Sequence, residues 1–200
     1  MTGAYSDQDK PTLTPSAMTI DLTGSGMLAV TRDTLTALRS ALMRDTGAAA
    51  AGYLQEAGYA GGQALFDAFR QWLTARGKGA PESLSVDAFQ RQATDFFRHA
   101  GWGSLELGAL DDTVATLDSR DWGEAEPGSG ADLPTCHLSA GMFADFFGRL
   151  ADAPLAVMEV ECRSRGDERC RFLLGSPEVM QRIYEGMANG EEYASAVKAL

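Results

Sequence analysis

The three cysteines of this 200-residue chain are spaced in a way that suits a metal site. Cys162 and Cys170 flank Arg165-Gly166-Asp167, which reads as a tight turn between alternating residues typical of a β-hairpin. With Gly166 at the centre of the turn, the two cysteines face each other, and their Cβ atoms lie within about 5.5 Å. Two thiolates at that separation can share one tetrahedral ion.

Further ligands must come from other parts of the sequence. Cys136 lies just before a predicted helix N-terminus, where unpaired N–H groups and the helix dipole favour a thiolate. Glu159 and Glu161 are the carboxylate candidates, but each is an odd number of residues from Cys162, so a regular strand would point them to the opposite face. A β-bulge or strand end between Val160 and Cys162 is therefore required if a glutamate is a ligand.

Two other states of the cysteines stay open at this point. A disulfide can join two of them, although three cysteines cannot all pair. The N-terminal sequence MTGAYSDQDK has no secretory signal, so we expect a cytoplasmic protein with reduced thiols. Buried free cysteines that act as small apolar residues are the stronger alternative, because the spacing lacks paired C-x-x-C motifs.

Composition limits the class of protein. A hydrophobic content of 44% in 200 residues suffices for one core, and we expect a flexible arm over residues 1–17 followed by a single domain over residues 18–200. A net charge of −11 argues against a nucleic-acid partner. No stretch approaches the roughly 18 apolar residues of a membrane span.

Periodicity predicts the secondary structure. Helical spacing indicates helices over 31–44, within the Gly/Ala-rich segment 47–79, from Ser83 or Ser85 to Gly101, from a cap at Ser139 to about 153, and after Ser176. Strand-like alternation indicates one hairpin over 103–119, a second over 153–175, and a small one joining 18–22 to 27–31. Residues 121–134 read as a long loop, either a mobile flap or an insertion. The order predicts an α+β domain, with an antiparallel sheet of about four strands from the two main hairpins packed against several helices.

The second hairpin also resembles a known family. Its pattern E-x-E-C-x3-G-x3-C, with Cys136 located 23 residues before Glu159, is similar to the 4-vinyl reductase domain. That domain also forms the sensory part of phenol- and xylene-responsive activators of the XylR and DmpR type, and its fold is related to small TRAPP subunits. The resemblance, best over about 85–175, implies a zinc ion held by Cys136, Glu159, Cys162 and Cys170. We expect Arg163, Arg169 and Arg171 to offset the charge of this site.

The resemblance further implies a domain that binds a small hydrophobic or aromatic molecule and forms a homodimer like its relatives. This sequence lacks the ATPase and DNA-binding modules of those activators, so we expect the domain to report through a separate regulatory protein or to carry the ligand. Trp102 lies near the position at which the phenol sensors keep a tryptophan that contacts the ligand. The candidate pocket residues are the aromatic side chains of the helices and first hairpin, which suit a plain core equally well: Tyr53, Tyr59, Phe66, Phe96, Phe97 and Trp102.

Catalytic groups are scarce in this sequence. It has only two histidines and no G-x-S-x-G, Walker, H-E-x-x-H or strand-linked G-x-G-x-x-G motif, so we expect a binding protein rather than an enzyme. Four protein ligands would leave no open position on the ion, which indicates a structural role. The alternatives are an accessory or carrier protein in tetrapyrrole or bacteriochlorophyll biosynthesis, including vinyl reduction, and a scaffold without a ligand, like the TRAPP relatives.

Overall fold

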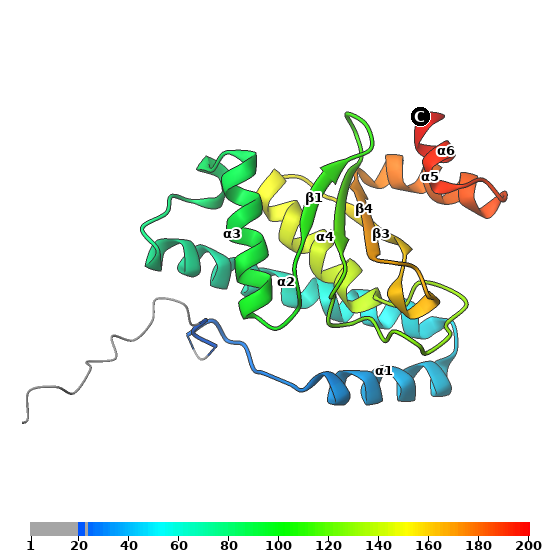
Figure 1. Cartoon of the computed structure of the whole chain (residues 1–200), viewed down its shortest axis with the longest axis horizontal. Coiled ribbons are helices and arrows are strands. Elements are labelled where there is room, and N and C mark those ends of the chain that lie inside the picture. The colour runs from blue at the N-terminus through cyan, green and yellow to red at the C-terminus, as the bar shows by residue number, and fades with distance from the viewer. Residues whose placement is uncertain (1–19, 23) are drawn as a thin grey trace, which may run out of the picture.

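The computed structural model describes residues 20–22 and 24–200. Its sheet has the strand order β1-β2-β4-β3, and all neighbouring strands are antiparallel (Figure 1). The strands are β1 (Glu106–Ala109), β2 (Ala115–Ser119), β3 (Ala156–Glu161) and β4 (Cys170–Gly175). Each of the two main predicted hairpins therefore forms, and the pairing of β2 with β4 joins them into one sheet.

Helices cover both faces of this sheet, which confirms the predicted α+β class. They are α1 (Arg32–Thr46), α2 (Ala49–Ala75), α3 (Val86–His99), α4 (His137–Ala151), α5 (Pro177–Ala188) and α6 (Tyr193–Lys198). Adjacent residues of β4 face different layers: Phe172 joins the main core with α2, α3 and α4, while Leu173 packs with α5 and α6. None of the described helices has the length and apolar character that crossing a membrane requires.

Helix caps explain where several helices begin. The side chains of Thr31, Ser85 and Ser176 each accept a hydrogen bond from the backbone N–H three residues later, as N-caps do. The predicted cap at Ser139 is wrong. α4 begins at His137, and the Ser139 hydroxyl instead accepts a hydrogen bond from an indole and donates one to a buried carboxylate.

An arm and a small hairpin were predicted for the N-terminal segment. The predicted arm over 1–17 lies outside the described residues. The small hairpin over 18–31 is wrong within the described part, because residues 20–22 and 24–31 contain no strand. A turn forms there instead, in which the Met27 N–H donates to the Leu22 carbonyl oxygen at 2.8 Å.

Glycines allow α2 and α4 to pack closely. A Cβ atom on Gly58 of α2 would collide with the backbone carbonyl oxygen of Leu138, and one on Gly141 of α4 would collide with that of Gln55. The Gly/Ala-rich segment thus forms one long helix in tight contact with α4. This contact fixes the N-terminal turn of α4, where the first cysteine lies.

We expect Gly58→Ala to lower the free energy of unfolding by about 1–3 kcal/mol, because backbone atoms must move to admit the methyl group. Gly61→Ala is the matched control: it lies on the same helix, and nothing is within 4 Å of its would-be Cβ atom. Since alanine favours helix more than glycine, this control should gain roughly 0.5–1 kcal/mol. Urea denaturation of both variants measures the difference. Equal stabilities would contradict the close packing of α2 on α4.

Candidate metal centre and pocket

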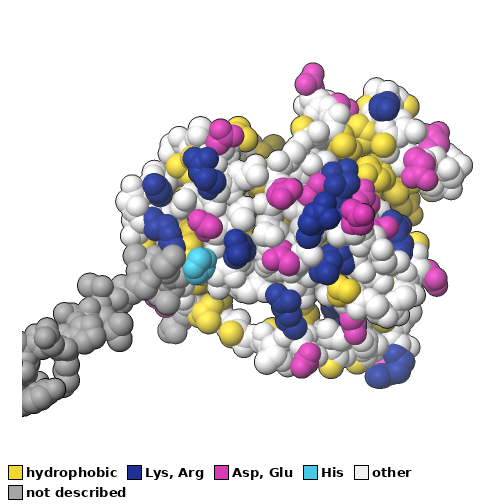
Figure 2. Space-filling view, in the orientation of Figure 1, with side chains coloured by type: hydrophobic (Ala, Val, Ile, Leu, Met, Phe, Trp, Pro, Cys, Tyr) yellow, Lys and Arg dark blue, Asp and Glu magenta, His cyan; other side chains and the backbone are white. Residues whose placement is uncertain are grey.

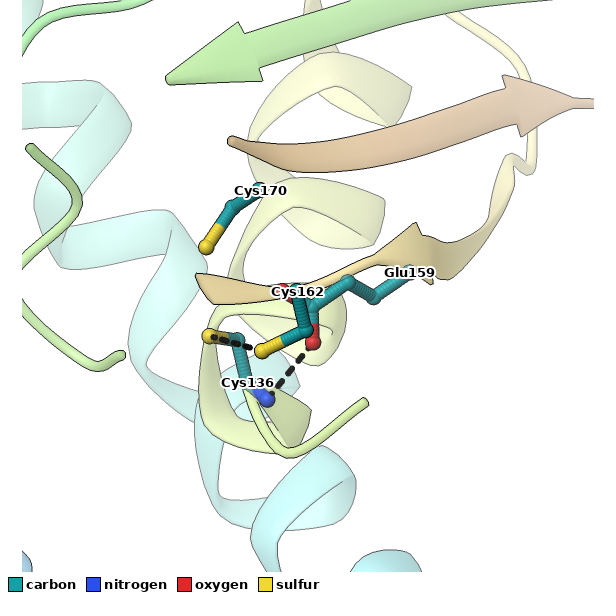
Figure 3. Close-up of side chains that lie close together, drawn as sticks. All are labelled: Cys136, Glu159, Cys162 and Cys170. Atoms are coloured by element: carbon teal, nitrogen blue, oxygen red, sulfur yellow. Dashed lines mark hydrogen bonds between the residues drawn. The ribbon is translucent and has the colours of Figure 1, made fainter. Parts of the chain in front are cut away.

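Four side chains that are far apart in sequence converge on one point. They are Cys136 at the N-cap of α4, Glu159 in β3, Cys162 directly after β3, and Cys170 at the start of β4. One ligand atom from each lies within 4.8 Å of the others, and the sulfur atoms and the carboxylate point toward a common centre (Figure 3). All three cysteines are free and fully buried. The four residues proposed as ligands are therefore brought together.

A β-bulge decides which glutamate reaches the site. Glu159 and Glu161 pair with successive residues of β4, so Val160 is the extra residue of a bulge. The bulge turns Glu159 to the same face as Cys162. It leaves Glu161 on the opposite face, where Arg169 donates two hydrogen bonds to its carboxylate. The irregularity that the sequence required is present, one residue earlier than predicted.

The connection between the two cysteine-bearing strands differs from the prediction. A tight turn over 165–167 is wrong, because a 3-10 turn over Arg163–Arg165 links the strands and ends at Gly166, with φ of 101°. The Cys162 N–H donates to Asp167 Oδ2 at 2.7 Å and closes the loop. Continuing the β3–β4 register by one residue still sets Cys162 opposite Cys170, as predicted.

The arrangement fits a divalent ion. The Cys136 N–H donates to Glu159 Oε2 at 2.8 Å, whereas Glu159 Oε1 is buried without a hydrogen-bond partner among the described residues. The Cys136 and Cys162 sulfur atoms are 3.9 Å apart, which is too long for a disulfide. This separation is close to the roughly 3.8 Å between two sulfur ligands of one tetrahedral zinc ion with Zn–S bonds of about 2.3 Å. A cation at the centre would satisfy the carboxylate oxygen that the protein leaves without a partner.

The pKa shifts of the candidate ligands also support a divalent ion at this site. Burial, together with the nearby Cys162 sulfur, raises the pKa of Glu159 to about 9. Hydrogen bonds from Cys136 and Cys170 lower the pKa of Cys162, and the bond to Cys162 raises the pKa of Cys136. In the protein alone, ionisation is therefore favoured at Cys162 and opposed at Cys136 and Glu159. A divalent cation would favour the other ligands in their ionised forms as well.

Arg169 and Arg171 do not offset the charge of the cluster, so this expectation was wrong for two of the three arginines near the cysteines. Arg171 donates two hydrogen bonds to Asp118, and Arg169 binds Glu161 and lies 3.4 Å from Asp118. These pairs lie on the other face of the sheet, where Figure 2 shows Lys/Arg and Asp/Glu side chains intermingled. The strand period explains the result, because residues 169 and 171 alternate with Cys170.

Backbone and hydroxyl groups form the immediate surroundings of the cluster instead. Thr135 Oγ1 lies 3.7 Å from the Cys162 sulfur and donates to Ser164 Oγ at 2.9 Å. The Glu126 N–H donates to the same serine oxygen at 2.8 Å. The long loop over 121–134 is thus tied to the hairpin turn. These contacts argue against a mobile flap, while the interpretation of the loop as an insertion stays a prediction.

A buried carboxylate in this loop, Glu124, went unrecognised in the sequence. It accepts hydrogen bonds from the N–H groups of Leu138 and Ser139 at 3.1 and 2.7 Å, and from the Ser139 hydroxyl. Its Oε1 lies 3.6 Å from Arg39 Nε, and the Arg39 side chain is only 10% exposed. Burial raises the pKa of Glu124, against the hydrogen bonds from Ser139 and the charge of Arg39. No local capping pattern could have revealed it, since it lies 14 residues before the Leu138 N–H that it caps.

Trp122, in the same loop, connects this network to the first hairpin. Its Nε1–H donates to Ser139 Oγ at 2.7 Å, and its ring stacks on Trp102 with centroids 5.5 Å apart. The side chain is 1% exposed. A tryptophan within a Gly-, Pro- and acid-rich loop is the signal that could have identified this segment as anchored.

The proposed ligand-contacting residues occupy three different environments. Phe66, Phe96 and Phe97 are buried in the aromatic core, whereas Tyr53 and Tyr59 are 53% and 55% exposed. Trp102 alone of the six lines the larger pocket, which has a volume of about 520 Å³. Tyr59 borders a shallower hollow of about 270 Å³ between α2 and α4.

The larger pocket lies between the N-terminal segment and the end of α3. Residues between Ile20 and Leu35 form one wall, and His99–Trp102 with Leu65 and Gly123 form the other. Most of these side chains are apolar. Gly123 adjoins both Trp122 and Glu124, so the pocket lining includes one residue of the loop that is tied to the cysteine–glutamate cluster.

Comparison with known families supports this description. Residues 125–176 match the family model of the 4-vinyl reductase domain. The predicted resemblance is confirmed. The matched segment covers 52 of the 200 residues and contains α4, β3, β4 and all four candidate ligands. No curated protein matches the chain in sequence.

Two solved structures share the fold at low sequence identity. The phenol-responsive sensory domain of the transcription activator PoxR, solved with phenol, is 17% identical, with a TM-score of 0.58 over 84% of this chain and 83% of that one. A trafficking protein particle complex subunit 3 from Naegleria fowleri, covalently bound to palmitic acid, is 14% identical, with a TM-score of 0.56 over 72% of this chain and 91% of that one. Both likenesses extend well beyond the segment that the family model matches, so the shared fold includes helices before residue 125.

Proposed function

We propose that residues 18–200 form a single zinc-stabilised domain that binds a small hydrophobic or aromatic molecule and acts as a sensor. The observation that carries this proposal is the largely apolar pocket of about 520 Å³ beside Trp102. Its size and lining suit a compact organic molecule. The solved relatives are consistent with this role, since one was obtained with phenol and another with palmitic acid.

Zinc is the ion that best suits the cluster. Three cysteine sulfur atoms and one carboxylate oxygen within 4.8 Å of one another match the preference of zinc for sulfur-rich sites with four ligands. With four protein ligands, no position is left for an activated water, so the ion holds α4 to the β3–β4 hairpin rather than performing catalysis. Its role is to stabilise the frame around the pocket.

The remaining parts of the proposal concern assembly. We expect a cytoplasmic homodimer that passes its signal to a separate regulatory protein. A pocket of this volume favours ligand binding over a scaffold without a ligand. Native mass spectrometry with elemental analysis reports zinc, any retained small molecule and the number of subunits together.

A pocket-filling substitution tests ligand binding with a neutral probe, 4-phenylbutan-1-ol. Ala100 lines the pocket at the end of α3, and Ala100→Phe should lower the affinity for the probe by at least about 10-fold, or about 1.4 kcal/mol. Ala60→Phe, at an exposed position of α2 outside the pocket, is the matched control and should leave the affinity unchanged. Isothermal titration calorimetry measures all three proteins. An undetectable affinity in the unmodified protein, or equal affinities in both variants, would overturn the assignment of this pocket.

A further inference from the structure

The side chains that line the pocket differ in charge from the protein as a whole. The chain carries a net charge of −11, yet no Asp or Glu is among the described residues that line the pocket. The polar side chains in the lining are Thr31, Arg32 and His99. An apolar chamber with a cation at its wall is complementary to a molecule that has an apolar body and a negatively charged end.

Arg32 is held against the pocket wall by backbone contacts. Its Nη2 donates to the Gly101 carbonyl oxygen at 3.0 Å, and its Nε would lie 3.1 Å from a Cβ atom on Gly123. Within residues 20–22 and 24–200, no carboxylate forms an ion pair with it. The guanidinium is therefore positioned but keeps most of its five N–H donors and its charge for another partner.

The first turn of α1 adds a second, independent contribution. Thr31, Arg32 and Leu35 all line the pocket, so the N-terminus of this 15-residue helix is at its wall. The partial positive charge at a helix N-terminus favours an anion there. His99, across the pocket, has its Nδ1 2.6 Å from the Asp95 carbonyl oxygen, which fixes the orientation of the ring.

We propose that the ligand of this pocket is an amphiphilic organic acid, whose carboxylate binds the Arg32 guanidinium at the first turn of α1 and whose apolar body packs against Trp102. This inference rests on the proposed function, because it specifies the chemistry of the molecule in the same pocket. A planar carboxylate can accept two parallel hydrogen bonds from a guanidinium, which makes arginine suited to this head group.

Two probes that differ only in their head groups test the proposal. The unmodified protein should bind 4-phenylbutyrate about 10-fold more tightly than 4-phenylbutan-1-ol, because hydrogen bonds to charged groups are stronger than neutral ones. Arg32→Gln should remove this preference by weakening the binding of 4-phenylbutyrate about 10-fold, while the affinity for the alcohol stays the same. Binding of the alcohol also shows that the variant is folded.

Arg44→Gln is the matched control, since Arg44 is on the same helix, lies outside the pocket, and is paired with Asp45 in solvent. It makes the same change in net charge and should leave both affinities unchanged. The inference is overturned if the two variants weaken 4-phenylbutyrate equally, or if the unmodified protein binds both probes equally well. In the latter case the alcohol still binds, so the proposed function survives. If the unmodified protein binds neither probe, the proposed function is refuted as well.

Discussion

Cys162→Ser should remove the metal and lower the thermal stability of the protein strongly. An ion present at about 1,000 times its dissociation constant contributes about 4 kcal/mol to folding. In a chain of this size, each kcal/mol shifts the melting temperature by about 2–4 °C, so we expect a loss of roughly 8–16 °C. Elemental analysis should show one zinc per unmodified chain and none in the variant. Calorimetry with and without a strong chelator measures the stability.

The bulge in β3 provides a matched pair of substitutions for this experiment. Glu159→Gln should lose zinc, because an amide is a weaker ligand than a carboxylate. Glu161→Gln, two residues away on the opposite face, should keep it. Unmodified protein without bound metal, together with a melting temperature that a strong chelator leaves unchanged, would instead support three buried cysteines that act as small apolar residues. Loss of zinc from both glutamate variants would contradict the assignment of the carboxylate ligand.

Local patterns in the sequence were sufficient to predict the strands and the helix that surround the cysteine–glutamate cluster. Alternation identified both main hairpins, and the odd spacing of Glu159 and Cys162 showed that a regular strand could not bring them together. The choice of Glu159 over Glu161 needed the family resemblance, because spacing alone treated the two equally. The coordinates supply the physical reason, which is the extra residue Val160.

Some errors in the prediction arose because the outcome depended on partners that are distant in sequence. Ser139 has the residue type of a cap, but its hydroxyl is used by Trp122 and Glu124. The alternation at 18–31 resembled a hairpin, yet the described residues of that segment form no strand and instead line the pocket near the end of α3. Aromatic side chains are apolar whether they line a pocket or fill a core, so residue type alone could not distinguish Phe96 and Phe97 from Trp102.

Arg39→Leu should destabilise the protein by about 3–5 kcal/mol, because it leaves the Glu124 carboxylate buried without its counter-charge. It also removes the hydrogen bonds that Arg39 donates to the carbonyl oxygens of Glu124 and Thr135, at 2.6 and 3.0 Å. Those bonds join α1 to the loop that leads into Cys136. Urea denaturation measures the loss, and Arg44→Leu, on the exposed side of the same helix, should show no measurable change.

The pH dependence separates a loss of charge pairing from a loss of packing. Burial already raises the pKa of Glu124 in the folded protein, and removing Arg39 removes one of the interactions that oppose this shift. A carboxyl whose folded pKa is raised contributes stability that is complete below its unfolded pKa, about 4.3, and is lost as the pH rises through the folded value. The difference in free energy of unfolding between Arg39→Leu and the unmodified protein should therefore narrow as the pH falls from 7 toward 5.

A second substitution, Glu124→Gln, should recover part of the stability that Arg39→Leu loses at neutral pH, because removing both members of the buried pair leaves no unpaired charge. A gap that is independent of pH and unaffected by the second substitution would assign the effect of Arg39 to its aliphatic packing alone.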